Sequence, residues 1–331
     1  MGVTIKDVAR EAGVSTATVS RVINNDNRIT PATRQRVLRV VSRLNYKVNT
    51  IARSLKSKRS LTVGMVVPEI DNVFFMRVAR GVEDHLGEKG YSMIVVNARE
   101  SRLREEGAVE LLLEKQVDGI IVVPSERDGS HLKMIHDAQA PVVLVDRLVE
   151  GFQSDAVLVD NEEATFHAMM DLIDAGRRNF GFIGGFREIF TAEERYRGFR
   201  RAIEERNVPL NPDHVCFGDY HMESGYDLMK RLMESRVPPE TLMVANYFMH
   251  IGAIRYLSFY RHRVPPSLFI ATFDNMEFSS VSGVPGLSIA QPIDEIGRQA
   301  AAMLLRRIEG DSSEWPRIQR LPTNIISHDT A

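Results

Sequence analysis

The fold of this chain is decided at its N-terminus, where residues 4–25 read TIKDVAREAGVSTATVSRVINN. Thr4 followed by Asp7 is a capping-box pattern, and apolar residues then recur at helical spacing as far as Gly13. Ser15 stands where it can cap a second helix. The stretch therefore predicts two short helices joined by a glycine turn.

A third helix is predicted within residues 30–46, TPATRQRVLRVVSRLNY. Thr30 precedes Pro31, and proline is favoured in the first turn of a helix. On the second helix the outward face holds small polar side chains and one arginine, a surface suited to reading base edges in a DNA groove. The apolar stripe expected on the third helix consists of Val37, Leu38, Val41 and Leu44.

Charge is distributed unevenly between the first 60 residues, here named the head, and the remainder, named the body. The head holds 13 Lys or Arg and three Asp or Glu, whereas the body holds 29 and 41. A basic segment attracts nucleic-acid phosphates because it displaces condensed counterions, and an acidic body is repelled by the same polyanion. We therefore expect the head to contact nucleic acid.

Length and composition indicate a folded protein of about two domains. The chain has 331 residues, of which 44% are hydrophobic and 26% charged, close to ordinary globular usage. A single cysteine, Cys216, excludes an intrachain disulfide and a cysteine-rich zinc site. The first residues lack the apolar run of a signal peptide, and no later run reaches the roughly 18 apolar residues of a membrane helix. We expect a cytoplasmic protein that associates with the nucleoid when it is bound to DNA.

Three stretches closely resemble the LacI/GalR family of bacterial transcription regulators. They are residues 4–25, residues 30–46 and residues 52–66, the last reading ARSLKSKRSLTVGMV. The resemblance covers nearly every position of the head and extends, with weaker signatures, over the body. It implies a three-helix helix-turn-helix domain over residues 1–48, a hinge helix and linker over residues 49–60, and an effector-binding and dimerisation domain over residues 61–331.

The resemblance also implies which residues contact operator DNA. Thr16, Ala17 and Arg21 would face bases, and Leu55 would be an apolar wedge that kinks the duplex from its minor groove. The family usually has proline where this chain has Val48, a departure at the start of the hinge helix. The full set expected at the DNA is Thr4, Ser15, Thr16, Ala17, Thr18, Ser20, Arg21, Asn24, Arg28, Thr30, Tyr46, Asn49, Ala52, Arg53, Ser54, Leu55 and Lys56.

In the body, short apolar runs alternate with amphipathic stretches of helical length, which is the pattern of parallel α/β sheets. The runs are LTVGMVV, YSMIVVNA, GIIVV, PVVLVD and AVLVD, then NFGFIGG, HVCFGD, TLMVAN and LFIATFD. They indicate two lobes with a cleft at the carboxyl ends of the strands. The resemblance implies a body similar to type I periplasmic sugar-binding proteins, in which the chain crosses between lobes near residues 161, 291 and 321. The N-lobe would take residues 61–161 plus 292–320, and the C-lobe residues 162–291 plus 321–331.

The cleft residues implied by the resemblance follow these strands in the sequence. Phe74 and Phe75 also fit a hydrophobic core, and Arg195 also fits a surface ion pair. Tyr247 departs from the family, which commonly has an aspartate there to accept hydrogen bonds from sugar hydroxyls. The full set expected at the effector is Asn72, Phe74, Phe75, Ser125, Asp146, Arg147, Asp160, Thr191, Arg195, Tyr220, Asn246, Tyr247, Asp274 and Gln291.

Motifs for catalysis are missing from the sequence. It contains no GxxxxGK[ST], GxGxxG, HExxH or GxSxG pattern, and its nine histidines show no zinc-ligand spacing. We expect no cofactor, no metal and no catalytic residue. A sugar-metabolising α/β enzyme with a DNA-binding head is the alternative function, and the basic head disfavours a simple solute-binding protein. The acid pairs Glu105–Glu106, Glu162–Glu163 and Glu193–Glu194 are expected to be solvated helix faces.

A single helix-turn-helix unit has a small footprint, so a homodimer on a palindromic operator is expected. Pro316 and Pro322 exclude a long C-terminal zipper. The cleft suits an effector that releases the operator and equally a corepressor that strengthens binding.

The charges expected in the cleft favour an anionic effector. Arg147 and Arg195 would be only partly neutralised by the carboxylates Asp146, Asp160 and Asp274, and an unpaired buried charge is costly. We therefore expect a sugar acid or sugar phosphate ahead of a neutral sugar. The alternative is that Arg147 pairs with a neighbouring acid and never reaches the ligand.

Overall fold

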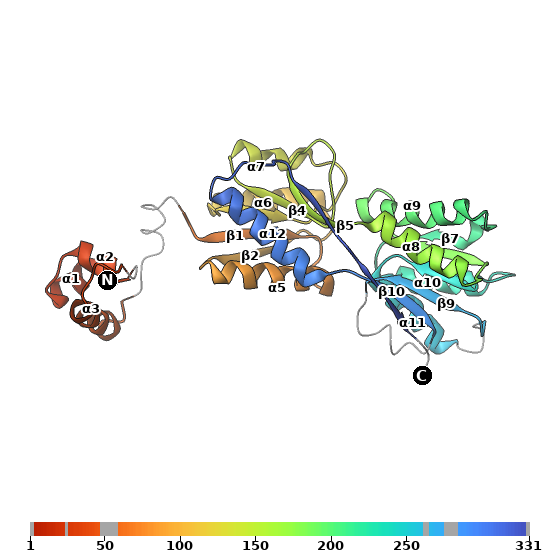
Figure 1. Cartoon of the computed structure of the whole chain (residues 1–331), viewed down its shortest axis with the longest axis horizontal. Coiled ribbons are helices and arrows are strands. Elements are labelled where there is room, and N and C mark those ends of the chain that lie inside the picture. The colour runs from red at the N-terminus through yellow and green to blue at the C-terminus, as the bar shows by residue number, and fades with distance from the viewer. Residues whose placement is uncertain (1–2, 24–25, 47–58, 261–264, 275–283, 329–331) are drawn as a thin grey trace. The chain divides into compact units, whose positions relative to one another are not determined.

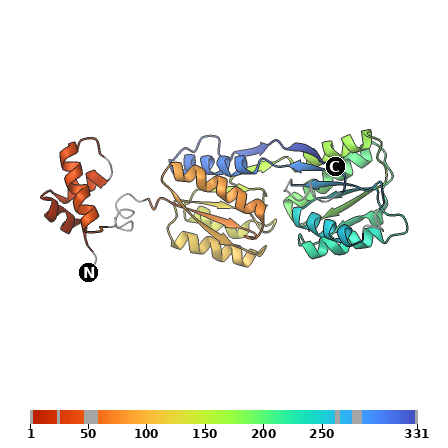
Figure 2. The same cartoon turned by 90° about the horizontal axis from the view of Figure 1, so that it is seen from below.

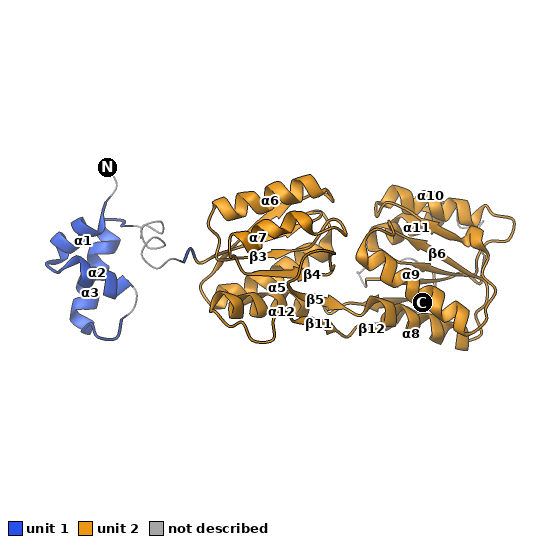
Figure 3. Ribbon diagram, turned by 90° about the horizontal axis from the view of Figure 1, so that it is seen from above, with its two compact units in different colours: residues 1–60 blue, residues 61–331 orange. Residues whose placement is uncertain are grey.

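The computed structural model describes the chain except for residues 1–2, 24–25, 47–58, 261–264, 275–283 and 329–331. The chain divides into two compact units, Met1–Ser60 and Leu61–Ala331, which Figure 3 colours separately. These units are the head and the body, and each is described by itself.

The head consists of three helices around one small apolar core, as the sequence predicts. They are α1 (Ile5–Ala12), α2 (Thr16–Ile23) and α3 (Pro31–Arg43). Gly13 ends α1 with a left-handed backbone (φ 62°), which glycine adopts without steric cost. The predicted stripe on α3 is wrong at Leu38, which is 47% exposed, whereas Val40 is buried. The buried core consists of Val8, Ala9, Ala12, Val19, Val22, Val37 and Val40.

The first lobe of the body is a six-stranded parallel sheet with helices on both faces (Figure 1). Its strand order is β11-β5-β4-β3-β1-β2. Successive side chains of a strand point to opposite faces, so Val63, Met65 and Val67 pack in the core on one face while Val66 packs in the core on the other. The elements of this lobe are β1 (Thr62–Val67), α5 (Val73–Glu88), β2 (Ser92–Asn97), α6 (Arg102–Glu114), β3 (Gly119–Val122), η1 (Ser130–Leu132), α7 (Lys133–Asp137), β4 (Val142–Val145), β5 (Asp155–Val159), α12 (Ile293–Ile308) and β11 (Ile318–Leu321).

Two helices of the first lobe, α5 and α12, lie side by side on one face of the sheet (Figure 2). Gly81 permits this close approach, because a methyl group on its Cα would lie 2.6 Å from the carbonyl oxygen of Asp294. The packing attaches α12, which comes late in the chain, to the elements that begin the body.

The second lobe repeats this architecture with one difference. Its strand order is β12-β10-β9-β8-β6-β7, and the pairing of β12 with β10 is antiparallel. The elements of this lobe are α8 (Asn161–Asp174), β6 (Phe180–Gly184), α9 (Phe190–Glu205), η2 (Pro212–His214), β7 (Val215–Phe217), α10 (Met222–Met233), β8 (Thr241–Val244), α11 (Tyr247–Phe259), β9 (Phe269–Phe273), β10 (Gly286–Ala290) and β12 (Asn324–His328).

The chain passes between the two sheets three times (Figure 1). It leaves the first sheet after β5, returns between β10 and α12, and leaves again between β11 and β12. These three passages, here named the crossings, lie beside one another at the junction of the lobes (Figure 1). Within the described residues, no helix is long and apolar enough to cross a membrane.

A buried ion pair within the first lobe holds α12 and the segment before β11 against β5. The Asp155 carboxylate, which is fully buried, accepts from Arg307 Nε at 2.5 Å and from Arg307 Nη2 at 3.0 Å. It also accepts from the backbone N–H of Arg317 at 2.7 Å. Removing one partner of such a pair leaves the other charge buried without compensation.

We expect Asp155→Ala to lower the free energy of unfolding of the body by about 3 to 5 kcal/mol, because Arg307 would keep its buried charge. Urea unfolding followed by circular dichroism measures the change. Glu150→Ala is the matched control, because Glu150 pairs with Arg127 on the surface and both side chains are more than half exposed. Similar, small losses in both variants would contradict the role given to Asp155.

Candidate functional site

The outward face of α2 presents the side chains that the sequence assigns to base reading. Thr16, Ala17 and Arg21 are exposed, and Ser20 is half-buried. Because Val19 and Val22 are buried in the head core, the helix cannot turn this face away from solvent. Asn24, Asn49, Ala52, Arg53, Ser54, Leu55 and Lys56, also predicted at the DNA, lie outside the described residues.

Several other predicted DNA residues carry structural roles in the head. Thr4 and Asp7 form the expected capping box, with the Thr4 N–H donating to Asp7 Oδ2 at 3.0 Å. The Ser15 hydroxyl accepts from the N–H of Thr18 at 3.1 Å. The Thr30 hydroxyl accepts from Thr33, Arg28 forms an ion pair with Asp26 at 2.7 Å, and Tyr46 packs half-buried against the head core.

In the body, two aspartates occupy equivalent positions in the two lobes. Asp146 follows β4 and donates its N–H to the carbonyl of Val157 on β5 at 3.0 Å. Asp274 follows β9 and donates its N–H to the carbonyl of Ile289 on β10, also at 3.0 Å. Both side chains are buried. The repeated strand order therefore brings one carboxylate from each lobe to the carboxyl edge of its sheet.

The backbone at these positions is strained. Asp146, Tyr220 and Asp274 have φ angles of 68°, 69° and 71°, in the left-handed region that non-glycine residues seldom adopt. Such conformations persist where the surrounding structure enforces them, and they concentrate at binding sites. Three sequence-predicted cleft residues share this feature.

Arg147 is neutralised by a glutamate that the sequence did not single out. Its guanidinium donates from Nη1 and Nη2 to the two carboxylate oxygens of Glu100, at 2.9 and 3.0 Å, and from Nη1 to the carbonyl of Pro124 at 2.8 Å. Its Nε lies 3.6 Å from Asp146 Oδ2. The two terminal nitrogens of Arg147 are therefore engaged, as in the alternative in which Arg147 pairs with an acid instead of the ligand.

Arg195 is buried and forms no ion pair with a described carboxylate. The interpretation of Arg195 as a partner in a surface ion pair is therefore wrong. Its Nε donates to Asn161 Oδ1 at 2.9 Å and its Nη1 to the carbonyl of Ala245 at 2.7 Å. The guanidinium carbon lies 3.7 Å from the centre of the Phe273 ring. A guanidinium has five N–H donors, and only two of these take part in those hydrogen bonds.

Burial dominates the protonation of the acidic groups in the cleft. It raises the pKa of Asp146, although the positive charges of Arg147 and Arg195 act to lower it. It also raises the pKa of Asp274, although the positive charge of Arg195 acts to lower it. Burial also raises the pKa of Tyr220 to about 12. Asp274 and Arg195 belong to the second lobe and both act on the pKa of Asp146 in the first, so the cleft residues of the two lobes face one another.

Several polar atoms in the cleft are buried without a hydrogen-bond partner among the described residues. They are Ser125 Oγ, Arg147 Nε and Gln291 Oε1, together with the Tyr220 hydroxyl, which lies near Thr191 outside hydrogen-bonding geometry. The Tyr220 ring covers Gly185 so closely that a methyl group there would lie 2.2 Å from the ring. Buried polar atoms are normally satisfied, so this cluster fits a polar ligand.

The remaining predicted cleft residues have structural roles or lie at the edge of the cleft. Asn72 and Asn246 cap α5 and α11 with their side-chain oxygens. Phe74, Phe75 and Tyr247 are part of the apolar core, although the Phe75 ring lies 5.8 Å from the Arg147 guanidinium. Thr191 is buried in the first turn of α9, and Asp160 is half exposed at a crossing, 3.5 Å from Arg320.

Two acids expected to be solvated are buried. Glu105 is fully buried, accepts from the Ser125 N–H at 2.6 Å and contacts His131 Nε2 at 2.8 Å. Glu194 is 4% exposed. Each side chain points between its helix and a neighbouring segment, and a pair of adjacent acids in the sequence does not reveal which of the two does so. The solvated interpretation is wrong for these two residues.

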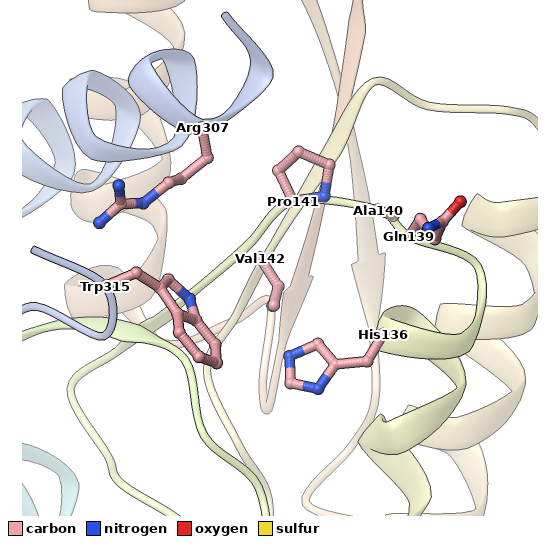
Figure 4. A pocket seen from close by; sticks show the side chains of 7 residues that line it. All are labelled: His136, Gln139, Ala140, Pro141, Val142, Arg307 and Trp315. Atoms are coloured by element: carbon pink, nitrogen blue, oxygen red, sulfur yellow. The ribbon is translucent and has the colours of Figure 1, made fainter. Parts of the chain in front are cut away.

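Two cavities lie apart from this group of side chains. One, of about 320 Å³, is lined by residues of the first lobe (Figure 4), with the rings of His136 and Trp315 6.2 Å apart. The other, of about 200 Å³, lies between Leu148 and Val149 of the first lobe and Phe190 of the second. No predicted cleft residue lines either cavity. Within the described residues, no three His, Cys, Asp or Glu side chains group closely enough to hold a metal ion.

Comparison with known proteins matches both units. Residues 60–328 match the periplasmic binding proteins and sugar binding domain of LacI family, and residues 4–49 match the bacterial regulatory proteins of the lacI family. The chain is 35% identical over 326 residues to catabolite control protein A of Priestia megaterium, covering 98% of each chain. It is 33% identical over 325 residues to the HTH-type transcriptional repressor PurR of Aliivibrio salmonicida, covering 98% of this chain and 97% of that protein. In fold it is similar to the lac repressor dimer bound to operator and the anti-inducer ONPF, with a TM-score of 0.87, 23% identity and coverage of 100% and 99%.

We expect Asp274→Asn to raise the thermal midpoint of the body at pH 7.5, because it removes a desolvated carboxylate while its amide oxygen can still accept from Gln291. The pKa of Asp274 is raised in the folded state, so protonation stabilises the native protein at low pH and this contribution is lost as pH rises through that pKa. The advantage of the variant should therefore shrink as pH falls.

Asp128→Asn is a control for which we expect the opposite change in thermal midpoint. Hydrogen bonds from Ser130 lower the pKa of Asp128, so its carboxylate stabilises the fold above its unfolded pKa and this contribution is lost as pH falls through the folded value. Asp128→Asn should therefore lower the midpoint at pH 7.5. An Asp274→Asn protein that is less stable than wild type at pH 7.5 would refute the burial argument.

Proposed function

Because this chain belongs to the LacI family of bacterial regulatory proteins, we propose that it is a repressor that binds a palindromic operator as a homodimer. A sugar-like effector bound between the lobes of the body would lower or raise its affinity for the operator. The relatives named above are transcriptional regulators. The chain is thus a DNA-binding regulator with a ligand-binding domain, and not the sugar-metabolising enzyme considered as the alternative.

The exposed face of α2 supports operator reading. Its small side chains let the helix approach base edges, and Arg21 is the one long donor on that face. The excess of basic residues in the head supplies the phosphate contacts that position such a helix. A symmetric pair of heads on two half-sites would provide the footprint that one head lacks, and the lac repressor with a similar fold binds its operator as a dimer.

The unpaired guanidinium of Arg195 carries the proposal for the effector class. Arg147 is satisfied by Glu100, so it contributes little free positive charge. Arg195 keeps donors that reach no described acceptor, and it lies in a site from which water is largely excluded. One anionic group would pair with it through charge-assisted hydrogen bonds. We therefore favour a sugar acid or a sugar phosphate, with a neutral sugar next.

The remaining polar groups suit the hydroxyls of a sugar ring. Asp146 and Asp274 can accept from hydroxyls on opposite sides of the ligand, because one belongs to each lobe. Gln291 already donates to Asp274 at 2.5 Å, which leaves its oxygen free to accept from the ligand. The aromatic face of Tyr220 can pack against the apolar C–H face of a sugar ring.

Arg21→Ala tests the DNA interface. A lost bidentate contact to a guanine should cost about 1 to 3 kcal/mol of operator affinity and relax preference at one base pair, whereas a lost phosphate contact should weaken all sequences alike. Fluorescence anisotropy on an operator and its single-base variants separates these outcomes. Arg36→Ala, on the exposed side of α3, removes the same charge as a control. An Arg21→Ala protein with unchanged affinity and preference would exclude Arg21 from the interface.

Calorimetric titration tests the effector class. Wild-type protein should bind glucuronate or glucose 6-phosphate more tightly than glucose, and Arg195→Ala should remove most of that advantage because it removes the unpaired cation. Arg187→Ala is the control, since Arg187 pairs with Glu193 on the surface. Tighter binding of glucose, or of a purine, would show the charge argument to be wrong.

A further inference from the structure

Glu194 is a buried carboxylate whose role the proposed function leaves open. It precedes Arg195 on α9 and is 4% exposed. Its Oε1 accepts from Arg320 Nη2 at 2.9 Å. Its Oε2 accepts from Asn161 Nδ2 at 3.2 Å and from Arg320 Nη1 at 3.4 Å. Both oxygens therefore act only as acceptors, and the contact with Asn161 is made by Oε2. Asn161 lies at the first crossing and Arg320 on β11 before the third.

The Asn161 side chain can point in only one way. Its Nδ2 donates to Glu194 and, at 3.4 Å, to the carbonyl of Val159, and both of these partners are acceptors. Its Oδ1 therefore faces the opposite side, where it accepts from Arg195 Nε at 2.9 Å. Asn161 is fully buried, so no water can replace a mismatched partner.

We propose that Glu194 is a positioning residue for Arg195: by fixing the orientation of the Asn161 amide, it holds the guanidinium with its remaining donors directed at the effector. The proposal rests on the proposed function only in taking Arg195 as the residue that contacts the effector. The same carboxylate links the first and third crossings, because it accepts from Asn161 at the first and from Arg320 on β11, just before the third.

Glu194→Gln breaks this arrangement without changing its shape. A glutamine has one acceptor oxygen, and the shorter, charge-assisted hydrogen bond from Arg320 Nη2 takes it. The glutamine NH₂ then occupies the place of Oε2, where it faces the NH₂ of Asn161 and the Nη1 of Arg320. Turning the Asn161 amide over relieves that clash but presents Nδ2 to the Nε–H of Arg195, so two donors meet and the hydrogen bond is lost.

Adding Asn161→Asp to the Glu194→Gln protein should restore the contact. In this double variant the new amide on α9 would donate to the new carboxylate at the first crossing, and that carboxylate would accept from Arg195 Nε. A residue that merely packs the core gives no reason for such rescue. Glu162→Gln is the matched control, because Glu162 lies on α8 and pairs with Arg197 and Arg201 toward the surface.

The Nε–H resonance of Arg195, observed by nitrogen-15 NMR of the full chain and assigned with Arg195→Lys, measures the contact without any ligand. Glu194→Gln should move this resonance toward the position of a freely exchanging guanidinium. The double variant should move it back, and Glu162→Gln should leave it in place. An unchanged resonance in folded Glu194→Gln protein would overturn the proposal, as would a double variant that fails to recover it.

Binding of inorganic phosphate, followed by calorimetry, separates this proposal from the proposed effector class. If Arg195 binds the anion, Glu194→Gln should weaken phosphate binding about tenfold, the value of one lost charge-assisted hydrogen bond. If the resonance shifts while phosphate affinity is unaffected, the positioning role stands and the anionic effector is wrong. An unshifted resonance overturns the positioning role whatever phosphate does.

Discussion

The cost of burying charge between two lobes is the constraint on which the rest of the body depends. Parallel sheets covered by helices leave their carboxyl edges as the place where polar side chains can meet, and here those edges face each other. Charges taken out of water must find partners there. Arg147 pairs with Glu100, and Asp274 accepts a hydrogen bond from Gln291. Arg195 is the exception, because it is held by an amide and a carbonyl, and our proposal of an anionic effector rests on this exception.

The two lobes use the same backbone conformation to place a carboxylate at the end of a strand. Each places an aspartate after its fourth strand, forces that residue into a left-handed conformation and anchors its N–H on the next strand. The sheets fix the positions of the carboxylates, and the three crossings join the two lobes. Polar contacts at the crossings, such as those of Asn161 with Arg195 and of Arg320 with Glu194, connect these passages to the residues that we propose for effector binding.

Much of this arrangement could be predicted from the sequence. Helix caps and continuous apolar runs predicted α1 to α3 and the strands β1 to β9, because those signals are local. Three strands were missed: β10 interrupts its apolar residues with Gly286 and Ser288, and β11 and β12 are edge strands that are largely exposed. Pairs across long separations, such as Arg147 with Glu100, carry no local signal at all. Glu194 looked like a solvent-facing acid because only the tertiary packing decides which member of an acid pair turns inward.

The three crossings also determine the order in which the protein can be completed during synthesis. The helices α1 to α3 of the head are complete once about its first fifty residues have left the ribosome. The first sheet lacks its edge strand β11 and its covering helix α12 until nearly the whole chain has emerged. Until then Asp155 has no Arg307, and the apolar face beneath α12 stands open. Domains generally form as units in the order of their synthesis, and exposed apolar surface invites aggregation. The nascent body therefore depends on its last forty residues, so a truncated transcript yields a head that can fold beside a body that cannot.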